Sequence, residues 1–414
     1  MSPNRSWIGK WIARAGVALL SCAVALAAAE FVLRHWLHAV PQLELDLYSR
    51  DPQGNLRLRP NITRRHVTRL WDVEIRINAE GWRDRAAAGP GQMTLLGLGD
   101  SMAFGWGVEL EESFLFLLEE RLRREEPVRL VKAAVPGAGP GDQVRLLQTI
   151  WAEYDPRAVL LCFFVGNDFV DVQMGGSAQF DVENGLLVRR ALGDEPVSWS
   201  SRARSGLIRS SHLLQLVRAV QLNWSRNDSS SPQGTGEPRH WDDWLREFAQ
   251  IHLTNYPERT RQAVAETFKF LDEMEAYCRQ RAVPLVLVVI PRSYQVYPEE
   301  RRELIEALDI SEADLDLDRP QRLLAEWASR RGVAAVDLLP AFRLHQQENP
   351  GVNLYHYPDA HWNAAGHRLA AEAIAGDAAA MAAIRSVSGP APEPADSAAP
   401  AGGAATPGQG TPLQ

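Results

Sequence analysis

Five apolar runs, separated by segments with helical periodicity, constrain the fold of this chain more than any other feature of its sequence. The runs lie at 94–98, 128–135, 158–164, 284–290 and 333–338. Each is apolar over several successive positions, as expected for strands that are covered on both faces of a parallel sheet. The pattern predicts a three-layer α/β/α sandwich with a mostly parallel five-stranded sheet.

The segments between these runs carry helical signals. One apolar helical face consists of Phe114, Leu115, Leu117, Leu118 and Leu122, and a second of Val264, Phe268, Leu271, Met274 and Cys278. A further helix is expected after Asp318, because Pro320 falls in its first turn and Gly332 just past its end.

The composition is that of a globular protein and narrows the classes of partner. The chain has 414 residues, of which 45% are apolar and 23% charged, and its net charge of −8 argues against nucleic acid as a partner. The three cysteines, Cys22, Cys162 and Cys278, allow at most one disulfide and do not suggest a metal site. We therefore expect neither a metal nor a cofactor.

The N-terminal segment has the form of an export signal. Basic residues at 5, 10 and 14 precede an uncharged run at 15–29, and apolar residues resume after Glu30. Cleavage at the alanines 27–29 would give a secreted protein, whereas reading 12–33 as one helix gives a membrane span. A lipoprotein site at Cys22 is disfavoured, because apolar residues follow it. We favour an uncleaved, single-pass inner-membrane anchor whose preceding positive charges leave the remainder in the periplasm.

Further shifts in pattern divide the chain. After an anchor or signal at 1–38, a β-rich lead-in is expected at 39–90, because Val73, Ile75 and Ile77 alternate with polar residues. The α/β domain is predicted at 91–388, and the Ala/Pro/Gly-rich tail at 389–414 is predicted to be disordered. The alternation of strands and helices fails at about 172–256, which we interpret as an insertion.

The insertion itself has two recognisable parts. It contains an amphipathic run at 212–224 and a Ser/Gly/Pro-rich stretch at 227–238, which we expect to be a mobile loop. Because it leaves the sheet just after the third strand, it could overhang the site as a lid, or form a partner surface.

The stretch 95–108 runs a buried strand into a glycine-spaced turn that carries Ser101. Glycines let the chain turn sharply and hold a side chain at the carboxyl edge of the sheet. A serine nucleophile also needs a base, an orienting acid and donors for an oxyanion. The alternatives are an ordinary turn, or a dinucleotide-binding loop whose third glycine would fall at Met102 and is missing.

Residues at the ends of the next two strands could supply the oxyanion donors. Gly137 follows the second strand, and its backbone N–H can approach a bound substrate. Asn167 follows the third strand, and its amide can donate a second hydrogen bond. Both positions are also typical of plain turns.

Near the C-terminus, Asp359 and His361 stand two residues apart, and Asn363 can cap the helix that follows. His361 is preferred to His356 and His367 as the base, because it has a close acid and lies beyond the fifth strand.

Taken together, these motifs resemble the SGNH or GDSL hydrolase family. The likeness rests on GlyAspSer at 99–101, a glycine after the second strand, GlyAsnAsp at 166–168 and Asp-x-His near the end, within 94–375. The segment 77–84 also resembles what precedes the serine in membrane-anchored bacterial members. The form Asp-x-His-Trp at 359–362 resembles alginate O-acetylation proteins.

The resemblance implies a flavodoxin-like fold. It also implies a Ser-His-Asp enzyme in which Ser101 is the nucleophile, His361 the base and Asp359 the acid that orients it. The Ser101 N–H, Gly137 and Asn167 would bind the oxyanion. The expected function is an extracytoplasmic, membrane-anchored esterase or O-acyltransferase acting on acetyl or similar esters of a glycan. The alternative is a catalytically silent glycan-binding or assembly module with the same fold.

Overall fold

A parallel five-stranded sheet forms the centre of the computed structural model, which describes residues 5–35, 41–42, 45–85, 92–189, 211–217, 220 and 246–385. The strand order is β12-β11-β8-β6-β7. The strands are β6 (Met93–Gly99), β7 (Val128–Ala134), β8 (Ala158–Phe164), β11 (Leu285–Ile290) and β12 (Ala334–Asp337). All five predicted strands are confirmed, and so is the predicted fold class.

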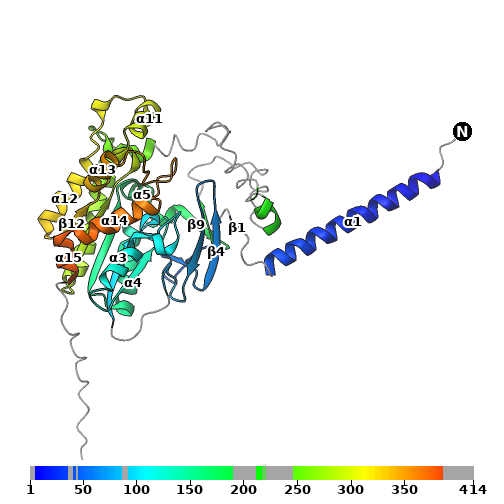
Figure 1. Ribbon diagram of the computed structural model, residues 1–414, viewed down its shortest axis with the longest axis horizontal. Coiled ribbons are helices and arrows are strands. Elements are labelled where there is room, and N and C mark those ends of the chain that lie inside the picture. The colour runs from blue at the N-terminus through cyan, green and yellow to red at the C-terminus, as the bar shows by residue number, and fades with distance from the viewer. Residues whose placement is uncertain are drawn as a thin grey trace, which may run out of the picture.

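Helices cover both faces of this sheet (Figure 1). On one face α3 (Phe114–Leu122) packs against α14 (Ala364–Gly376), which contacts α15 (Ala378–Arg385). On the other, α4 (Pro140–Tyr154) and α5 (Asp168–Met174) pack against α9 (Glu258–Arg279). This arrangement follows from right-handed crossovers between parallel strands.

The helix α12 (Arg319–Arg331) begins and ends where Pro320 and Gly332 predict, and Gly332 has the left-handed conformation just past its end. Its Trp327 Nε1 donates to Asp272 of α9 at 2.8 Å, so α12 lies beside α9. The remaining short helices are α2 (Ser101–Phe104), α10 (Ser293–Val296), α11 (Pro298–Leu308), α13 (Leu339–Glu348) and the 3₁₀ turns Leu110–Glu112, Gly176–Gln179, Gln250–His252 and Glu312–Asp314.

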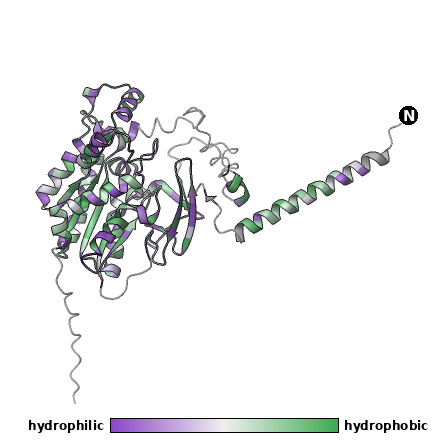
Figure 2. Ribbon diagram, viewed as in Figure 1, coloured by the Kyte–Doolittle hydropathy of each residue, from purple (hydrophilic) through white to green (hydrophobic). Residues whose placement is uncertain are grey.

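The lead-in is built of short strands, as predicted. β4 (Ile62–Val67) pairs antiparallel with β5 (Asp72–Ile77) and parallel with β1 (Pro41–Gln42), while β2 (Tyr48–Arg50) pairs with β3 (Leu56–Leu58). The core of the molecule is continuous between the lead-in and the α/β domain, because Ile75, Ile77 and Trp82 belong to the same buried cluster as the central strands. Figure 2 shows hydrophobic residues concentrated along those strands.

The insertion is described in part. It includes the hairpin β9 (Phe180–Glu183) and β10 (Leu186–Arg189), which contacts the lead-in where Tyr48 N–H donates to Gly185 O at 2.8 Å. A helical turn lies at 212–217, within the predicted amphipathic run. The expected loop at 227–238 and the tail at 389–414 lie outside the described residues.

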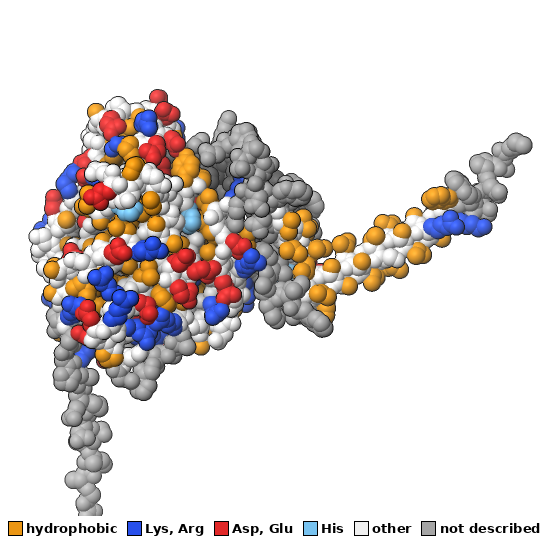
Figure 3. All heavy atoms as spheres, viewed as in Figure 1, with side chains coloured by type: hydrophobic (Ala, Val, Ile, Leu, Met, Phe, Trp, Pro, Cys, Tyr) orange, Lys and Arg blue, Asp and Glu red, His pale blue; other side chains and the backbone are white. Residues whose placement is uncertain are grey.

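The N-terminal segment forms one helix, α1 (Arg5–His35), and hydrophobic side chains lie along its surface (Figure 3). Its stretch Ala13–Leu33 is long and apolar enough to cross a membrane, with a mean hydropathy of 2.2. A signal sequence at an N-terminus has the same properties.

The strand order places β6 between β7 and β8, although β7 and β8 follow it along the chain. Helices therefore leave the carboxyl ends of β6 and β7 toward opposite faces of the sheet. Open α/β sheets bind their ligands at such a position. The segments after β6, β7 and β8 carry Ser101, Gly137 and Asn167.

Candidate active site

Ser101 is the first residue of α2, directly after β6. Gly99 allows this close junction, because a Cβ built there would lie 2.6 Å from Ala103 Cβ and 3.0 Å from Cys162 O. The preceding Asp100 caps the helix, since its Oδ1 accepts from Met102 N–H at 2.8 Å. The serine is thereby held at the carboxyl edge of the sheet, with its side chain partly exposed.

Asp359 and His361 lie in a tight loop that is closed by an antiparallel bridge between Tyr355 and Trp362. Trp362 is fully buried and stacks on Phe342 at a centroid distance of 4.9 Å, which anchors the end of the loop. As predicted, Asn363 caps α14, accepting from the N–H groups of the second and third residues of the helix.

These two elements bring Ser101, His361 and Asp359 into one hydrogen-bonded chain. The distance from Ser101 Oγ to His361 Nε2 is 2.7 Å, and that from His361 Nδ1 to Asp359 Oδ1 is 2.5 Å. Burial by itself would raise the pKa of Asp359, but the charge and hydrogen bonds of His361 outweigh it and lower that pKa to about 2. The carboxylate is therefore ionised at neutral pH and can hold a proton on Nδ1, which leaves Nε2 as the acceptor facing the serine.

The two other histidines weighed as bases are engaged elsewhere. His356 Nε2 lies 3.2 Å from Gly107 O, and His367 Nδ1 accepts from Phe114 N–H at 3.2 Å. Burial lowers the pKa of His367 to about 3, so this ring is neutral and acts as a packing and capping group.

Gly137 and Asn167 occupy the strand ends that the sequence predicts. Gly137 has a φ of 82°, and within the described part of the chain its N–H has no hydrogen-bond acceptor. The hairpin β9–β10 lies against it, because a Cβ built on Gly137 would meet Leu187 Cδ1 at 3.4 Å. Asn167 Nδ2 donates to Asp100 Oδ2 at 2.9 Å, which ties the third strand end to the first and leaves the second amide proton available.

Two carboxyl groups in the segments that carry Ser101 and Asn167, those of Asp100 and Asp168, are buried. Burial raises the pKa of Asp100, and it raises the pKa of Asp168 well above its ordinary value, where the charge of Asp100 adds to the effect. Asp168 Oδ2 accepts from Phe164 N–H at 2.8 Å, at the end of β8, and makes no hydrogen bond to His361. Among the described residues, no group of three or more His, Cys, Asp or Glu side chains is arranged to hold a metal.

Sequence reasoning missed an aromatic wall beside His361, made of His66, Trp71, Trp106 and His356. Trp71 Nε1–H donates to His66 Nδ1 at 3.0 Å, His66 meets Trp106 edge to face at 4.9 Å, and the Trp106 ring lies 6.4 Å from that of His361. Burial lowers the pKa of His66 to about 4, so its ring is neutral. The sequence signal that could have indicated this wall is Trp106, which lies between two glycines after the serine. The second of these, Gly107, lies close to Trp71, because a Cβ built on it would meet Trp71 at 3.0 Å.

Residues 241–394 match the family described as the SGNH hydrolase-like domain of the acetyltransferase AlgX. This region includes the loop of Asp359 and His361. Comparison with curated proteins returned no match to the chain.

Solved structures that are similar to this chain include TesA, at 14% identity with a TM-score of 0.36, covering 71% of this chain and 99% of that one. The acetyl xylan esterase AlAXEase has 14% identity and a TM-score of 0.37, covering 68% and 97%. A G-D-S-L lipolytic protein from Desulfitobacterium hafniense DCB-2 has 12% identity and a TM-score of 0.34, covering 68% and 97%.

Proposed function

We propose that this chain is a serine esterase or O-acyltransferase whose catalytic triad is Ser101, His361 and Asp359, and the match of residues 241–394 to the SGNH hydrolase-like domain of AlgX supports this. The observation that supports this proposal most directly is the hydrogen-bonded chain from Ser101 Oγ through His361 to Asp359, with distances of 2.7 and 2.5 Å. Nucleophile, base and orienting acid are the parts that acyl transfer requires.

In the proposed reaction, Ser101 Oγ attacks the acyl carbonyl carbon while His361 Nε2 takes the hydroxyl proton. The tetrahedral intermediate collapses when His361 returns that proton to the leaving alcohol oxygen, which leaves an acyl ester on Ser101. Water or an acceptor hydroxyl then attacks this ester, and His361 takes its proton. The bond between the acyl carbon and Ser101 Oγ breaks as His361 returns the proton to that oxygen, so the products are free Ser101 and either the free acid or a new ester. Asp359 keeps its charge throughout and stabilises the imidazolium.

The oxyanion is proposed to bind the backbone N–H of Ser101, the N–H of Gly137 and the side-chain amide of Asn167. Each comes from a different strand end at the switch point of the sheet. The bond from Asn167 to Asp100 fixes the orientation of the amide before substrate arrives. A preorganised donor of this kind contributes about 2.7–4 kcal/mol to lowering the barrier.

The substrate is proposed to be an acetyl or similarly short acyl ester of a glycan. The acetyltransferase in the description of the matched family supports the acyl group. The side chains of His361 and Asp359 are each 21% exposed, so the reacting atoms lie near the surface, where an ester on a polymer can reach them.

The protein is proposed to stay anchored through α1, with the enzyme domain in the periplasm. The length and hydropathy of Ala13–Leu33 support a span, and the basic residues that precede it support this orientation.

A serine-directed fluorophosphonate probe tests the proposal on the full chain in detergent. Labelling and turnover of p-nitrophenyl acetate are expected for the wild type and for the exposed-serine control Ser329→Ala. Ser101→Ala and His361→Ala are expected to lower kcat by about 10⁴–10⁶-fold. Turnover retained in Ser101→Ala would remove that serine as the nucleophile, and an unlabelled wild type would favour a silent glycan-binding module.

A further inference from the structure

Arg83 of the lead-in is a buried cation whose hydrogen bonds converge on the loop that follows Ser101. It is 1% exposed. Its Nη1 donates to Gly105 O at 2.5 Å and to Phe104 O at 3.3 Å, and its Nη2 donates to Val108 O at 2.6 Å and to Glu74 O at 3.1 Å. Three of these four acceptors belong to the nucleophile loop, defined here as residues 101–108.

No carboxylate pairs with this guanidinium within the part of the chain that the structure describes, so backbone carbonyl groups compensate its charge. Burial lowers the pKa of Arg83 to about 10, against the opposing charges of the acidic residues 109, 111 and 112. Arg83 therefore remains protonated at neutral pH. A buried charge is expensive unless its hydrogen bonds are made, so the loop and the arginine hold each other in one arrangement.

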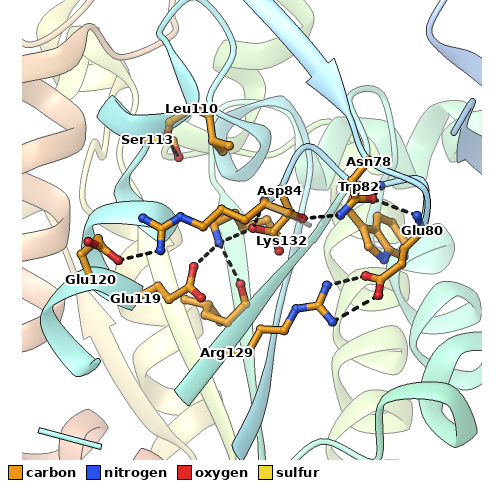
Figure 4. A network of polar contacts seen from close by, with 12 residues as sticks. Asn78, Glu80, Trp82, Asp84, Leu110, Ser113, Glu119, Glu120, Arg129 and Lys132 are labelled. Atoms are coloured by element: carbon orange, nitrogen blue, oxygen red, sulfur yellow. Dashed lines mark hydrogen bonds and ion pairs between the residues drawn. The ribbon is translucent and has the colours of Figure 1, made fainter. Parts of the chain in front are cut away.

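The neighbours of Arg83 fix its backbone to the α/β domain. Trp82 Nε1 donates to the hydroxyl of Tyr154 on α4 at 2.8 Å. On the other side, Asp84 accepts from Lys132 Nζ of β7 at 2.8 Å, and these two side chains are each 2% exposed. Figure 4 shows Lys132 in contact with Asp84 and with Glu119 of α3. Arg83 therefore acts on the loop from a fixed position.

The nucleophile loop contains Ser101 and is linked through His356 to the loop that carries His361. Trp106 N–H donates to Ser101 O at 3.1 Å, and Gly107 O lies 3.2 Å from His356 Nε2. The backbone N–H of His356 donates to His361 O at 2.9 Å, within the loop that carries the base. A displacement of the loop would move Ser101 and His361 relative to each other.

We propose that Arg83 is a positioning residue that sets the distance between Ser101 and His361 by holding the nucleophile loop. This inference rests on the proposed function of those two residues. The planar guanidinium reaches carbonyls on both sides of its fork, which the single ammonium of lysine cannot do. A misplacement of about 1 Å in a catalytic pair can cost about 10²-fold in rate.

The test compares Arg83→Lys and Arg83→Met with Arg129→Met in the full chain. Arg129 is also a buried arginine, paired with Glu80, but among the described residues it makes no hydrogen bond or ion pair with the nucleophile loop. Active sites are titrated with the fluorophosphonate, so that kcat refers to folded enzyme. The rate of Ser101 labelling, kcat and KM for p-nitrophenyl acetate are then measured.

Both Arg83 variants are expected to lose about 10²-fold in kcat and in labelling rate, with KM changed less than about threefold. Arg129→Met is expected to lower the melting temperature while its labelling rate stays at the wild-type value. If Arg83→Met does not fold, Arg83→Lys carries the comparison, because it keeps the buried charge. If Arg83→Lys is labelled at the wild-type rate while Ser101→Ala is inactive, the inference about Arg83 is wrong and the proposed function stands. Full turnover in Ser101→Ala overturns the proposed function as well.

Discussion

Asp359 reaches His361 within a turn that contains only Ala360, and a single oxygen makes both contacts. Asp359 Oδ1 accepts from the backbone N–H of His361 at 2.9 Å and lies 2.5 Å from its ring Nδ1. The backbone contact fixes the turn, and the ring contact fixes the tautomer. The short spacing in the sequence is therefore compatible with an orienting acid.

Asp359→Asn is expected to lower kcat by about 10³–10⁴-fold, which is less than the loss from removing the serine or the histidine. An amide can keep the backbone hydrogen bond, but it no longer favours the proton on Nδ1 or stabilises the imidazolium. The measurement is kcat at neutral pH, with circular dichroism to show that the variant is folded. Parental turnover would mean that another group orients His361.

Asp168→Asn is the matched control, because Asp168 is the other acid that the sequence offers. Its pKa is raised by burial and then by neighbouring acids, so the native state holds a proton that the unfolded chain loses above a pH of about 4. The stability of the wild type therefore falls as pH rises from that value. Asp168→Asn should keep turnover and unfold at higher urea than the wild type at pH 8, with no difference near pH 3. Lost turnover in this variant alone would transfer the role of the acid to Asp168.

At the scale of elements, the lead-in contributes more to the site than its sequence indicates. His66 lies on β4, and Trp71 lies directly before β5. One side of the aromatic wall therefore comes from outside the α/β domain. The segment after β5 supplies Arg83 to the nucleophile loop. We therefore expect the contacts between lead-in and domain to affect the proposed catalysis as well as stability.

Lys132→Met should weaken this joint strongly. It would leave Asp84 and Glu119, which Lys132 Nζ contacts at 2.8 and 2.5 Å, as buried carboxylates without their cation. Breaking such a group costs about 3–5 kcal/mol in the free energy of unfolding, measured by urea denaturation. Arg123→Met is the control, because its contact with Glu119 is 3.7 Å long and its side chain 38% exposed, so the loss should stay below about 1 kcal/mol. Equal losses in the two variants would contradict this account.

The five strands and the site residues at their carboxyl ends could be predicted from the sequence. The aromatic wall and the position of Arg83 could not. Continuous apolar runs identify strands covered on both faces, and the carboxyl ends of such strands indicate where Ser101, Gly137 and Asn167 lie. His66 and Arg83 reach the site through the packing of the lead-in on the domain, which leaves no periodic signal. A buried arginine that is held by carbonyl groups looks in sequence like any exposed one.

At the scale of the whole molecule, the proposed periplasmic location of the enzyme domain depends on α1. Alkaline phosphatase fused after residue 85 is expected to be active, because the basic residues before the candidate span keep the N-terminus in the cytoplasm. Fractionation should find the full-length chain in the membrane. An inactive fusion would reverse the orientation, and a mature protein that starts at Glu30 would show that the segment is a cleaved signal.

The bond between Ser101 and His361 joins positions 260 residues apart. A chain that is made and exported from its N-terminus presents the serine early, but the base and its acid arrive only when nearly all of the α/β domain has emerged. Until then the hydroxyl is an ordinary alcohol. Interrupted synthesis, or proteolysis before residue 359, would therefore yield fragments that cannot cleave esters, and acyl chemistry would begin only with a finished molecule.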